Sequence, residues 1–252
     1  MIKSETRDRV ARIELARLDK KNALTGEMYA GLADAIGAAD ADPQVRALLL
    51  HGAPDCFCAG NDVGDFLNRP PLVEGSPSQR FFQAMLDLKK PLVAAVGGPA
   101  VGIGTTMLLH CDLVYAAPNA RFQLPFVPLG IVPEFGSTYL LPLLAGYQRA
   151  AELLLLGQPF TAQKAHEVGI VTEVVPQEKL LDHALERATA LVALPPESLR
   201  LTKHLLKKRH GQVVREAIAE EVKLFGERLK SAEAKEALSA FLEKRKPDFS
   251  RF

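Results

Sequence analysis

The chain has 252 residues, with 31 basic and 30 acidic side chains and a formal net charge of +1. Hydrophobic residues make up 48% of it, which excludes disorder as the main state of the chain. No apolar run approaches the roughly 18 residues of a membrane-spanning helix, so we expect no membrane segment. The near-neutral charge argues against a dedicated nucleic-acid-binding protein.

The cysteine and histidine patterns exclude two kinds of site. Three cysteines (Cys56, Cys58 and Cys111) are too few for a disulfide framework, and C-x-C is not a zinc spacing. The six histidines are scattered without carboxylates at metal spacing, so we expect no metal site. The N-terminus is charged where a signal peptide is apolar, which favours a cytoplasmic location.

The first third of the chain alternates strands with a helix. Residues 10–18 alternate apolar and charged side chains, which predicts a strand. Residues 27–39 place apolar side chains on one helical face, and residues 45–51 form a short buried strand. A loop rich in Gly, Pro, Asp and Asn follows over residues 53–77.

The middle of the chain repeats this alternation. A helix over residues 78–88 precedes an apolar strand from Pro91, and a Gly-rich turn leads to a helix over residues 105–110. Further strands are expected over residues 112–117 and from Arg121. Short apolar strands separated by helices indicate crossover connections and a largely parallel sheet, so we predict an α/β fold.

Helices dominate the remaining residues. Residues 134–156 predict two helices broken near Gly146, and Thr161 is a candidate cap of a short helix. That helix leads into an apolar strand over residues 169–175. From about residue 177 the apolar period is helical throughout.

The sequence divides into two predicted units. We expect an α/β core over residues 1–194 and a helical module over residues 195–252, which Pro195-Pro196 opens. The module holds three amphipathic segments and carries 14 Lys and Arg against 9 acidic side chains. Its basic character has two interpretations, a solvated helix face or contacts with anionic groups.

Three glycine-containing segments are candidates for chemistry: residues 58–63, 98–105 and 129–137. Gly-rich turns after parallel strands expose backbone N–H groups, and a helix N-terminus adds its positive dipole end. Two such turns facing one cleft can stabilise an oxyanion. The alternative is that the glycines only permit tight turns and close packing.

The chain resembles the crotonase (enoyl-CoA hydratase/isomerase) family. The segments that carry the resemblance stand in the family's order, and they are Lys21-Asn22-Ala23-Leu24, FCAGND (57–62), AVGIGTTMLLHCDLVYA (100–116), LGIVPEFGST (129–138), AHEVGIVTEVVP (165–176) and FLEKRKPDFSRF (241–252). The resemblance implies a spiral of ββα repeats, a C-terminal helical trimerisation module, and a homotrimer or dimer of trimers. It also implies an acyl-CoA substrate, with coenzyme A as part of the substrate rather than a separate cofactor.

The resemblance also assigns binding roles. The backbone N–H groups of Asn61 and Ile103 would form the oxyanion hole. Other residues would line the path of the substrate: Lys21, Ala23, Leu24, Ala59, Gly60, Asp62, Val63, Gly102 and Phe126. Lys246 in the basic tail would meet a phosphate of coenzyme A, although a solvated helix face accounts for it equally simply.

The catalytic positions depart from the hydratase pattern. Hydratases of this family use two carboxylates, and the matching positions here hold Thr106 and Phe126. Adding water across a double bond needs one group to activate water and one to supply a proton. We therefore expect ordinary hydratase activity to be absent.

One acid remains in a catalytic context, Glu134 in V-P-E-F-G. The resemblance to Δ3,Δ2-enoyl-CoA isomerases predicts that this single Glu shuttles a proton, with burial raising its pKa. The alternatives are an acid that only stabilises a helix N-terminus, other enolate chemistry (hydration, hydrolysis or ring isomerisation), and a catalytically degenerate acyl-CoA-binding or nucleic-acid-binding protein.

Overall fold

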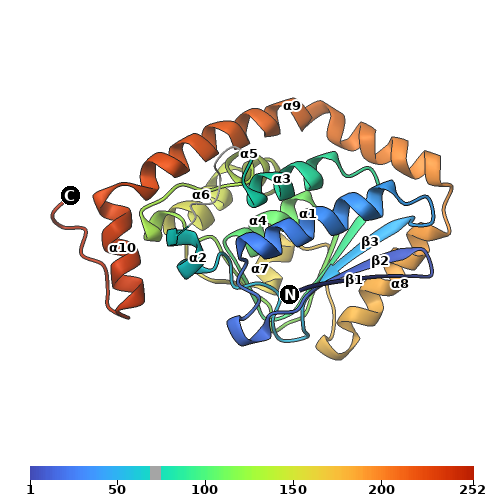
Figure 1. Ribbon diagram of the computed structural model, residues 1–252, viewed down its shortest axis with the longest axis horizontal. Coiled ribbons are helices and arrows are strands. Elements are labelled where there is room, and N and C mark those ends of the chain that lie inside the picture. The colour runs from blue at the N-terminus through green and yellow to red at the C-terminus, as the bar shows by residue number, and fades with distance from the viewer. Residues whose placement is uncertain (69–74) are drawn as a thin grey trace.

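The computed structural model describes residues 1–68 and 75–252. Part of the loop predicted over residues 53–77 therefore lies outside the described residues. The chain folds into an α/β structure in which helices surround a central sheet (Figure 1). The predicted fold class is confirmed.

The central sheet has six strands in the order β1-β2-β3-β4-β6-β9. The strands are β1 (Ile2–Arg7), β2 (Val10–Leu15), β3 (Ala47–His51), β4 (Leu92–Val96), β6 (Leu113–Ala116) and β9 (Glu173–Val174). β1 pairs antiparallel with β2, and each other neighbouring pair is parallel. The crossovers that the strand–helix alternation predicts are present, whereas β1 was not predicted.

A second, smaller strand layer positions the glycine-containing segments. It contains β5 (Pro99–Val101), β7 (Arg121–Gln123) and β8 (Phe160–Thr161). Isolated parallel bridges join Cys58 to Ala100 and Asn61 to Leu24. The layer thus brings the segment around residues 58–61 between β5 on one edge and residues 21–24 on the other.

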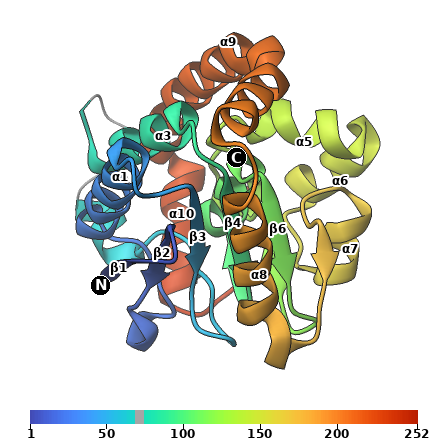
Figure 2. The same cartoon turned by 90° about the vertical axis from the view of Figure 1, so that its right-hand side faces the viewer.

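The central sheet buries both faces because its strands alternate between two apolar clusters. Leu48 and Leu50 of β3 enter the larger cluster, which α1 (Gly26–Ala41) and α3 (Pro77–Asp87) cover. Leu49 enters the smaller cluster, against α8 (Leu180–Val192). Figure 2 shows α8 lying along the strands. This alternation is the period of two that a pleated strand imposes.

Short helices connect these layers. The α-helices are α2 (Val63–Asn68), α4 (Ile103–Thr106), α5 (Ser137–Ala145), α6 (Tyr147–Leu156) and α7 (Ala162–Glu167), and the 3-10 helices are η1 (Leu18–Lys20), η2 (Met107–His110), η3 (Val127–Leu129) and η4 (Gln177–Lys179). Gly146 separates α5 from α6, as predicted. Thr161 caps α7 by accepting a hydrogen bond from the Lys164 N–H at 3.2 Å, which confirms the predicted cap.

The C-terminal helices differ from the prediction. Two of the three expected segments form one helix, α9 (Pro196–Leu229), and the third is α10 (Ala232–Leu242). A Cβ atom at Gly211 would meet nothing within 4 Å, so no close approach forces a break there. Packing offsets the roughly 1 kcal/mol helix cost of a glycine, because Val214 and Phe225 are buried. Figure 1 shows α9 extending along the molecule above α3 and α5.

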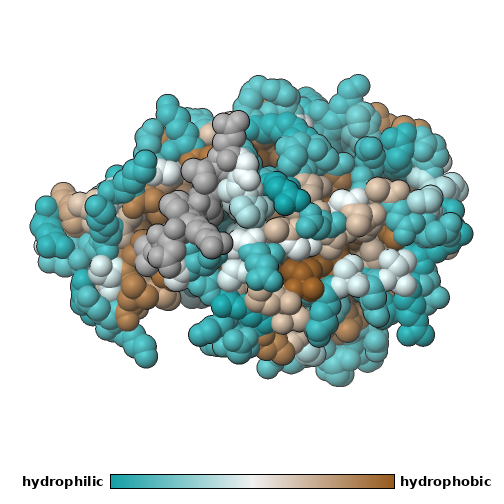
Figure 3. Space-filling model, in the orientation of Figure 1, coloured by the Kyte–Doolittle hydropathy of each residue, from teal (hydrophilic) through white to brown (hydrophobic). Residues whose placement is uncertain are grey.

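On the face shown in Figure 3, polar side chains predominate, and hydrophobic surface gathers at the end formed by α10. Phe241 and Leu242 of that helix are each 59% exposed. Within the described residues, no helix combines the length and the apolar character that crossing a membrane requires.

Candidate active site

The segment that carries Asn61 is held on both edges by backbone hydrogen bonds. The Leu24 N–H donates to the Gly60 carbonyl at 2.8 Å, and the Asp62 N–H donates to the Leu24 carbonyl at 2.9 Å. On the other edge, the Val101 N–H donates to the Cys58 carbonyl at 2.9 Å. These bonds fix the turn as an inserted strand of the smaller layer.

The Asn61 N–H has a defined direction. The Gly60 carbonyl points to Leu24, and the carbonyl and N–H of one trans peptide unit point in opposite directions. The N–H of Asn61 therefore points away from Leu24, toward the edge on which β5 and α4 lie. Gly60 itself has a φ of 98°, a value that favours glycine at this turn.

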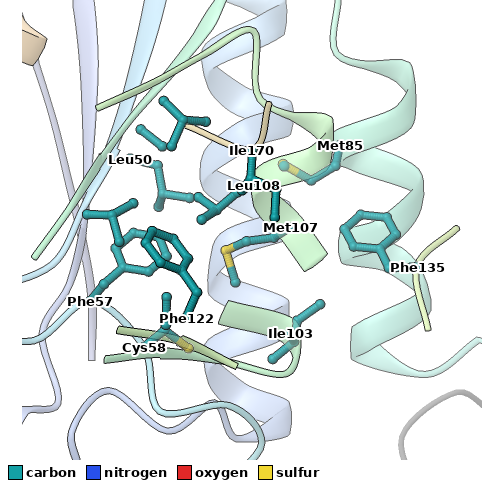
Figure 4. Packing of buried hydrophobic residues seen from close by; sticks show 14 of the residues in the cluster. Leu50, Phe57, Cys58, Met85, Ile103, Met107, Leu108, Phe122, Phe135 and Ile170 are labelled. Carbon is teal, nitrogen blue, oxygen red and sulfur yellow. The ribbon is translucent and has the colours of Figure 1, made fainter. Parts of the chain in front are cut away.

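Ile103 supplies a second N–H at the same edge. It is the first residue of α4, and the Gly102 carbonyl before it accepts the N–H groups of Thr105 and Thr106 at 2.9 Å each. The first N–H groups of a helix have no carbonyl partner within the helix. The Ile103 N–H thus points out of the helix N-terminus, while its side chain is fully buried (Figure 4).

Two close approaches bring the donors together. A Cβ atom on Gly60 would lie 3.0 Å from the Val101 carbonyl oxygen, and one on Gly104 would lie 2.6 Å from the Cys58 carbonyl oxygen. The start of α4 is therefore packed directly on the segment that leads to Asn61. This arrangement places two backbone donors at one edge, as an oxyanion site requires.

Glu134 lies in the loop between η3 and α5. Its side chain is buried, with 1% of the residue exposed, and Oε1 has no hydrogen-bond partner among the described residues. Burial, with a smaller contribution from the charge of Glu221, raises the pKa of Glu134 to about 8. The structure thus contradicts the alternative of an exposed acid at a helix start.

Tyr29 holds the side chain of the Asn61 turn and responds to the charge of Glu134. The Tyr29 hydroxyl donates to Oδ1 of Asn61 at 2.6 Å. Burial first, and then the charges of Glu134 and Cys58, raise the pKa of Tyr29. The Glu134 carboxyl is therefore within electrostatic reach of the residues that hold the turn. Sequence analysis missed Tyr29, although a tyrosine beside a predicted apolar helix face needs a partner for its hydroxyl.

Aromatic packing anchors the loop after Glu134. Phe135 has a φ of 59°, which is rare for a bulky residue. Its ring stacks on Phe82 and on His110, with ring centroids 3.9 Å apart in each pair. His110 Nε2 donates to the Phe135 carbonyl at 2.7 Å, and burial lowers the pKa of His110 to about 3, so the ring is neutral. Figure 4 shows Ile103 and Met107 between Cys58 and Phe135.

The two positions that lack a carboxylate are buried. Thr106 is fully buried, and its Oγ1 has no hydrogen-bond partner in the described part of the chain. Phe126 is 4% exposed and starts the turn into η3. At these positions the chain offers one hydroxyl and one aromatic ring in place of two acids.

The residues predicted along the substrate path lie in one strip. Arg17 Nη1 donates to the Ala23 carbonyl at 2.9 Å and to Asp62 Oδ2 at 2.7 Å. The hydrogen bond from Arg17 is the largest cause of a lowered pKa at Asp62, so this acid is held ionised. Lys21 is exposed with a φ of 49°.

The other members of this set are placed as follows. Ala23, Leu24, Ala59, Gly60 and Val63 lie on the same two paired segments or at the start of α2, and Gly102 caps α4. Lys246 lies apart in the exposed tail after α10. The structure therefore brings the residues of the two paired segments together, whereas Phe126 lies at the start of η3 and Lys246 in the tail. Their binding roles stay predictions.

The charged groups show no metal centre. Within residues 1–68 and 75–252, no group of three or more His, Cys, Asp or Glu side chains is arranged to hold an ion. Glu134 and Cys58 are instead close to apolar groups, and burial raises the pKa of Cys58 to about 12. The site is suited to proton transfer in a dry environment.

Comparison with known proteins places this geometry in a family. A model of the enoyl-CoA hydratase/isomerase family matches residues 5–251. The 1,2-epoxyphenylacetyl-CoA isomerase of Escherichia coli (strain K12) is 37% identical over 251 residues, which cover 96% of this chain and 95% of that protein. Enoyl-CoA delta isomerase 2 of Rattus norvegicus is 36% identical and covers 94% of this chain, which spans 62% of that longer protein.

The structural comparison agrees. Pseudomonas aeruginosa OdaA is 46% identical with a TM-score of 0.93, over 96% of this chain and 98% of that chain. This match over nearly the whole chain confirms the fold that the resemblance implied. Hydratases as well as isomerases are among the relatives. The chain belongs to the enoyl-CoA hydratase/isomerase family and is an enzyme of the kind that processes acyl-CoA thioesters.

Proposed function

We propose that the protein moves the double bond of a 3-enoyl-CoA to the 2-enoyl position, with Glu134 as the only proton carrier. The observation that carries this proposal is the buried carboxylate of Glu134, whose Oε1 has no hydrogen-bond partner among the described residues. Its charge acts on Tyr29, the hydrogen-bond partner of Asn61. Thr106 and Phe126 stand where a hydratase would need acids. One carboxylate is sufficient for a 1,3 proton shift and insufficient for adding water.

The reaction has two proton transfers. The ionised Glu134 takes a proton from C2, the C2–H electron pair enters the π system, and negative charge develops on the thioester oxygen. The N–H groups of Asn61 and Ile103 stabilise that charge. The same carboxyl then returns the proton to C4, so the double bond ends between C2 and C3 and the carbonyl is restored.

The electrostatics of the site suit this role. A base with a pKa of about 8 is a much stronger proton acceptor than an exposed carboxylate, which matches it better to a weakly acidic C–H group. Phe126 and Phe135 are both buried and exclude water from the region. Exclusion of water favours isomerisation over hydration of the same intermediate.

The test is an ultraviolet assay with 3-enoyl-CoA esters of several chain lengths, following the conjugated 2-enoyl thioester. We expect turnover in the wild type and a loss of about 10²-fold or more in Glu134→Gln. Glu216→Gln is the matched control, because Glu216 is exposed on α9 and receives a hydrogen bond from Gln212. Hydration of 2-enoyl-CoA is measured in parallel.

Three outcomes would contradict the proposal. Hydration faster than isomerisation would favour the hydratase alternative, and binding of CoA esters without turnover would favour a binding-only role. Retained isomerisation in Glu134→Gln would exclude Glu134 as the proton carrier.

We further propose that the enzyme works in the cytoplasm as a homotrimer or a dimer of trimers. Exposed apolar side chains support an oligomer: Leu143, Leu144, Tyr147, Leu155, Leu156, Leu205 and Leu206. They belong to α5, α6 and α9, whose contact with water is unfavourable in an isolated chain. Light scattering during size-exclusion chromatography gives the mass directly, and a monomer at micromolar concentration would contradict this part.

A further inference from the structure

A second buried acid, Glu221, lies in the middle of α9. It is 4% exposed and lies next to the loop that carries Glu134. Its neighbours on the same helix face are Val214, Ile218 and Phe225. An acid in such an apolar stripe is costly unless hydrogen bonds satisfy it.

The loop after Glu134 satisfies both oxygens of Glu221. Oε2 accepts the Gly136 N–H at 2.6 Å. Oε1 accepts the Thr138 N–H at 2.9 Å and the Thr138 hydroxyl at 2.5 Å. The carboxylate thereby caps α5, whose own N-cap residue, Gly136, has no side chain to do so.

The capped loop needs external support. Phe135 and Gly136 have φ angles of 59° and 72°, so two consecutive residues adopt the left-handed region. A bulky residue in that region is strained, because its Cβ atom approaches the following carbonyl oxygen. A Cβ atom on Gly136 would lie 3.2 Å from Val214 and 3.4 Å from Ile218, which shows how closely α9 packs on the loop.

We infer that Glu221 is a positioning residue, which holds loop 134–138 and through it the Glu134 carboxylate in place for proton transfer. This inference rests on the proposed function, because it assigns to Glu134 the proton transfer described above. Glu221 does not touch the substrate in this role. It acts through the backbone of the catalytic loop.

The charge of Glu221 has a separate effect. The titratable groups that face Glu134 are Tyr29 of α1, Cys58 before the Asn61 turn and Glu221 of α9. Behind Phe135, His110 is neutral. Of these groups, Glu221 is the one whose charge raises the pKa of Glu134, in addition to burial. Removing the charge should lower that pKa.

Two substitutions separate position from charge. Glu221→Asp keeps the charge, but its carboxylate is one methylene shorter and does not reach both N–H groups. Glu221→Gln keeps the length, but removes the charge and presents an amide N–H₂ to one of the donors. We expect kcat for isomerisation to fall about tenfold to a hundredfold in both, because a small misplacement of a catalytic group is costly.

The pH dependence distinguishes positioning from general damage to the fold. The ionised base is the active form, so the wild-type rate falls as pH decreases through the pKa of Glu134. We expect this acidic limb to move to lower pH in Glu221→Gln and to stay in place in Glu221→Asp. A rate that falls equally at every pH in Glu221→Gln, with the limb unmoved, would overturn the effect of the Glu221 charge on Glu134.

Hydrogen exchange gives a readout that does not depend on turnover. The Gly136 and Thr138 amides should exchange at least tenfold faster in Glu221→Gln, while Glu216→Gln leaves them unchanged. Unchanged exchange, or a kcat within twofold of the wild type, would overturn the inference. If the wild type does not isomerise 3-enoyl-CoA, the proposed function fails by itself, and exchange alone then decides whether Glu221 holds the loop.

Discussion

The burial of Glu134 should make the stability of the protein depend on pH. The carboxyl keeps its proton up to about pH 8 in the folded chain, whereas its ordinary pKa is 4.5. Between these values the unfolded chain has released the proton and the folded chain has not. The free energy of unfolding therefore decreases as pH rises from 4.5 to about 8. Below pH 4.5 the carboxyl is protonated in both states and does not change that free energy.

The magnitude follows from the size of the shift. One pKa unit corresponds to about 1.4 kcal/mol, so a rise from 4.5 to about 8 corresponds to roughly 5 kcal/mol. This figure is an upper bound, because local relaxation and entry of water reduce the cost of burying a charge. Above pH 8 the carboxyl is ionised in both the folded and the unfolded chain, so the loss of unfolding free energy stays constant.

Glu134→Gln isolates this effect, because glutamine has the same shape and does not ionise. Urea unfolding of both proteins at intervals from pH 4.5 to 8.5 gives the difference in unfolding free energy. We expect the two proteins to have almost the same unfolding free energy at pH 4.5. As pH rises, the variant should become more stable than the wild type by up to about 1.4 kcal/mol per pH unit. Glu216→Gln serves as the control and should show no such slope. A difference that stays flat with pH would refute the assignment of a buried, protonated Glu134.

Three further substitutions test other parts of the site and fold. Tyr29→Phe removes the donor to the Asn61 side chain and should lower isomerase turnover about tenfold without unfolding the protein. Gly104→Ala places a Cβ atom 2.6 Å from a backbone oxygen, which should spread the two N–H donors and lower kcat about 10²-fold. Lys203→Met removes a buried ammonium group that donates to the Lys90 carbonyl at 2.6 Å and to Asp112 at 2.7 Å, and should cost about 1–2 kcal/mol in urea unfolding.

Two control variants show whether a loss of activity comes from the tested contact or from a general effect on the fold. Gly37→Ala changes a glycine of α1 whose Cβ atom would meet nothing within 4 Å, so activity should be unchanged. Tyr115→Phe removes the hydroxyl of a buried tyrosine on the other side of the central sheet, against α8. If either control lowers turnover as much as its test variant, the corresponding explanation is wrong. A loss of under about 0.5 kcal/mol in Lys203→Met would contradict a stabilising role for the hydrogen bonds of Lys203.

Strands with two buried faces were predictable, and the edge strand was not. β3 and β4 read as continuous apolar runs because both of their faces are covered. β1 is exposed over five of its six residues, so its side chains carry no apolar pattern. The length of α9 was also unpredictable, because tertiary packing and not local propensity carries the helix through Gly211.

The site was predictable only in part for a similar reason. Glu134 was predicted as the proton carrier because a local motif and a family resemblance both mark it. Glu221 contacts the loop from 85 residues further along the chain, and no local pattern encodes that contact. A signal was present nevertheless, since Glu221 falls on the same helical face as Val214, Ile218 and Phe225. A lone acid in an apolar stripe is a reason to look for a buried partner.

Glu221 is synthesised long after the loop that it contacts. A ribosome adds about 5 to 20 residues per second, so the 85 residues from Gly136 to Glu221 take roughly 4 to 17 seconds. Every strand of the central sheet has been synthesised before Glu221 is added. During that interval a nascent chain can complete its sheet while its base still lies on an uncapped loop. A chain terminated before Glu221 would retain its sheet strands and lack the hydrogen bonds that hold Gly136 and Thr138.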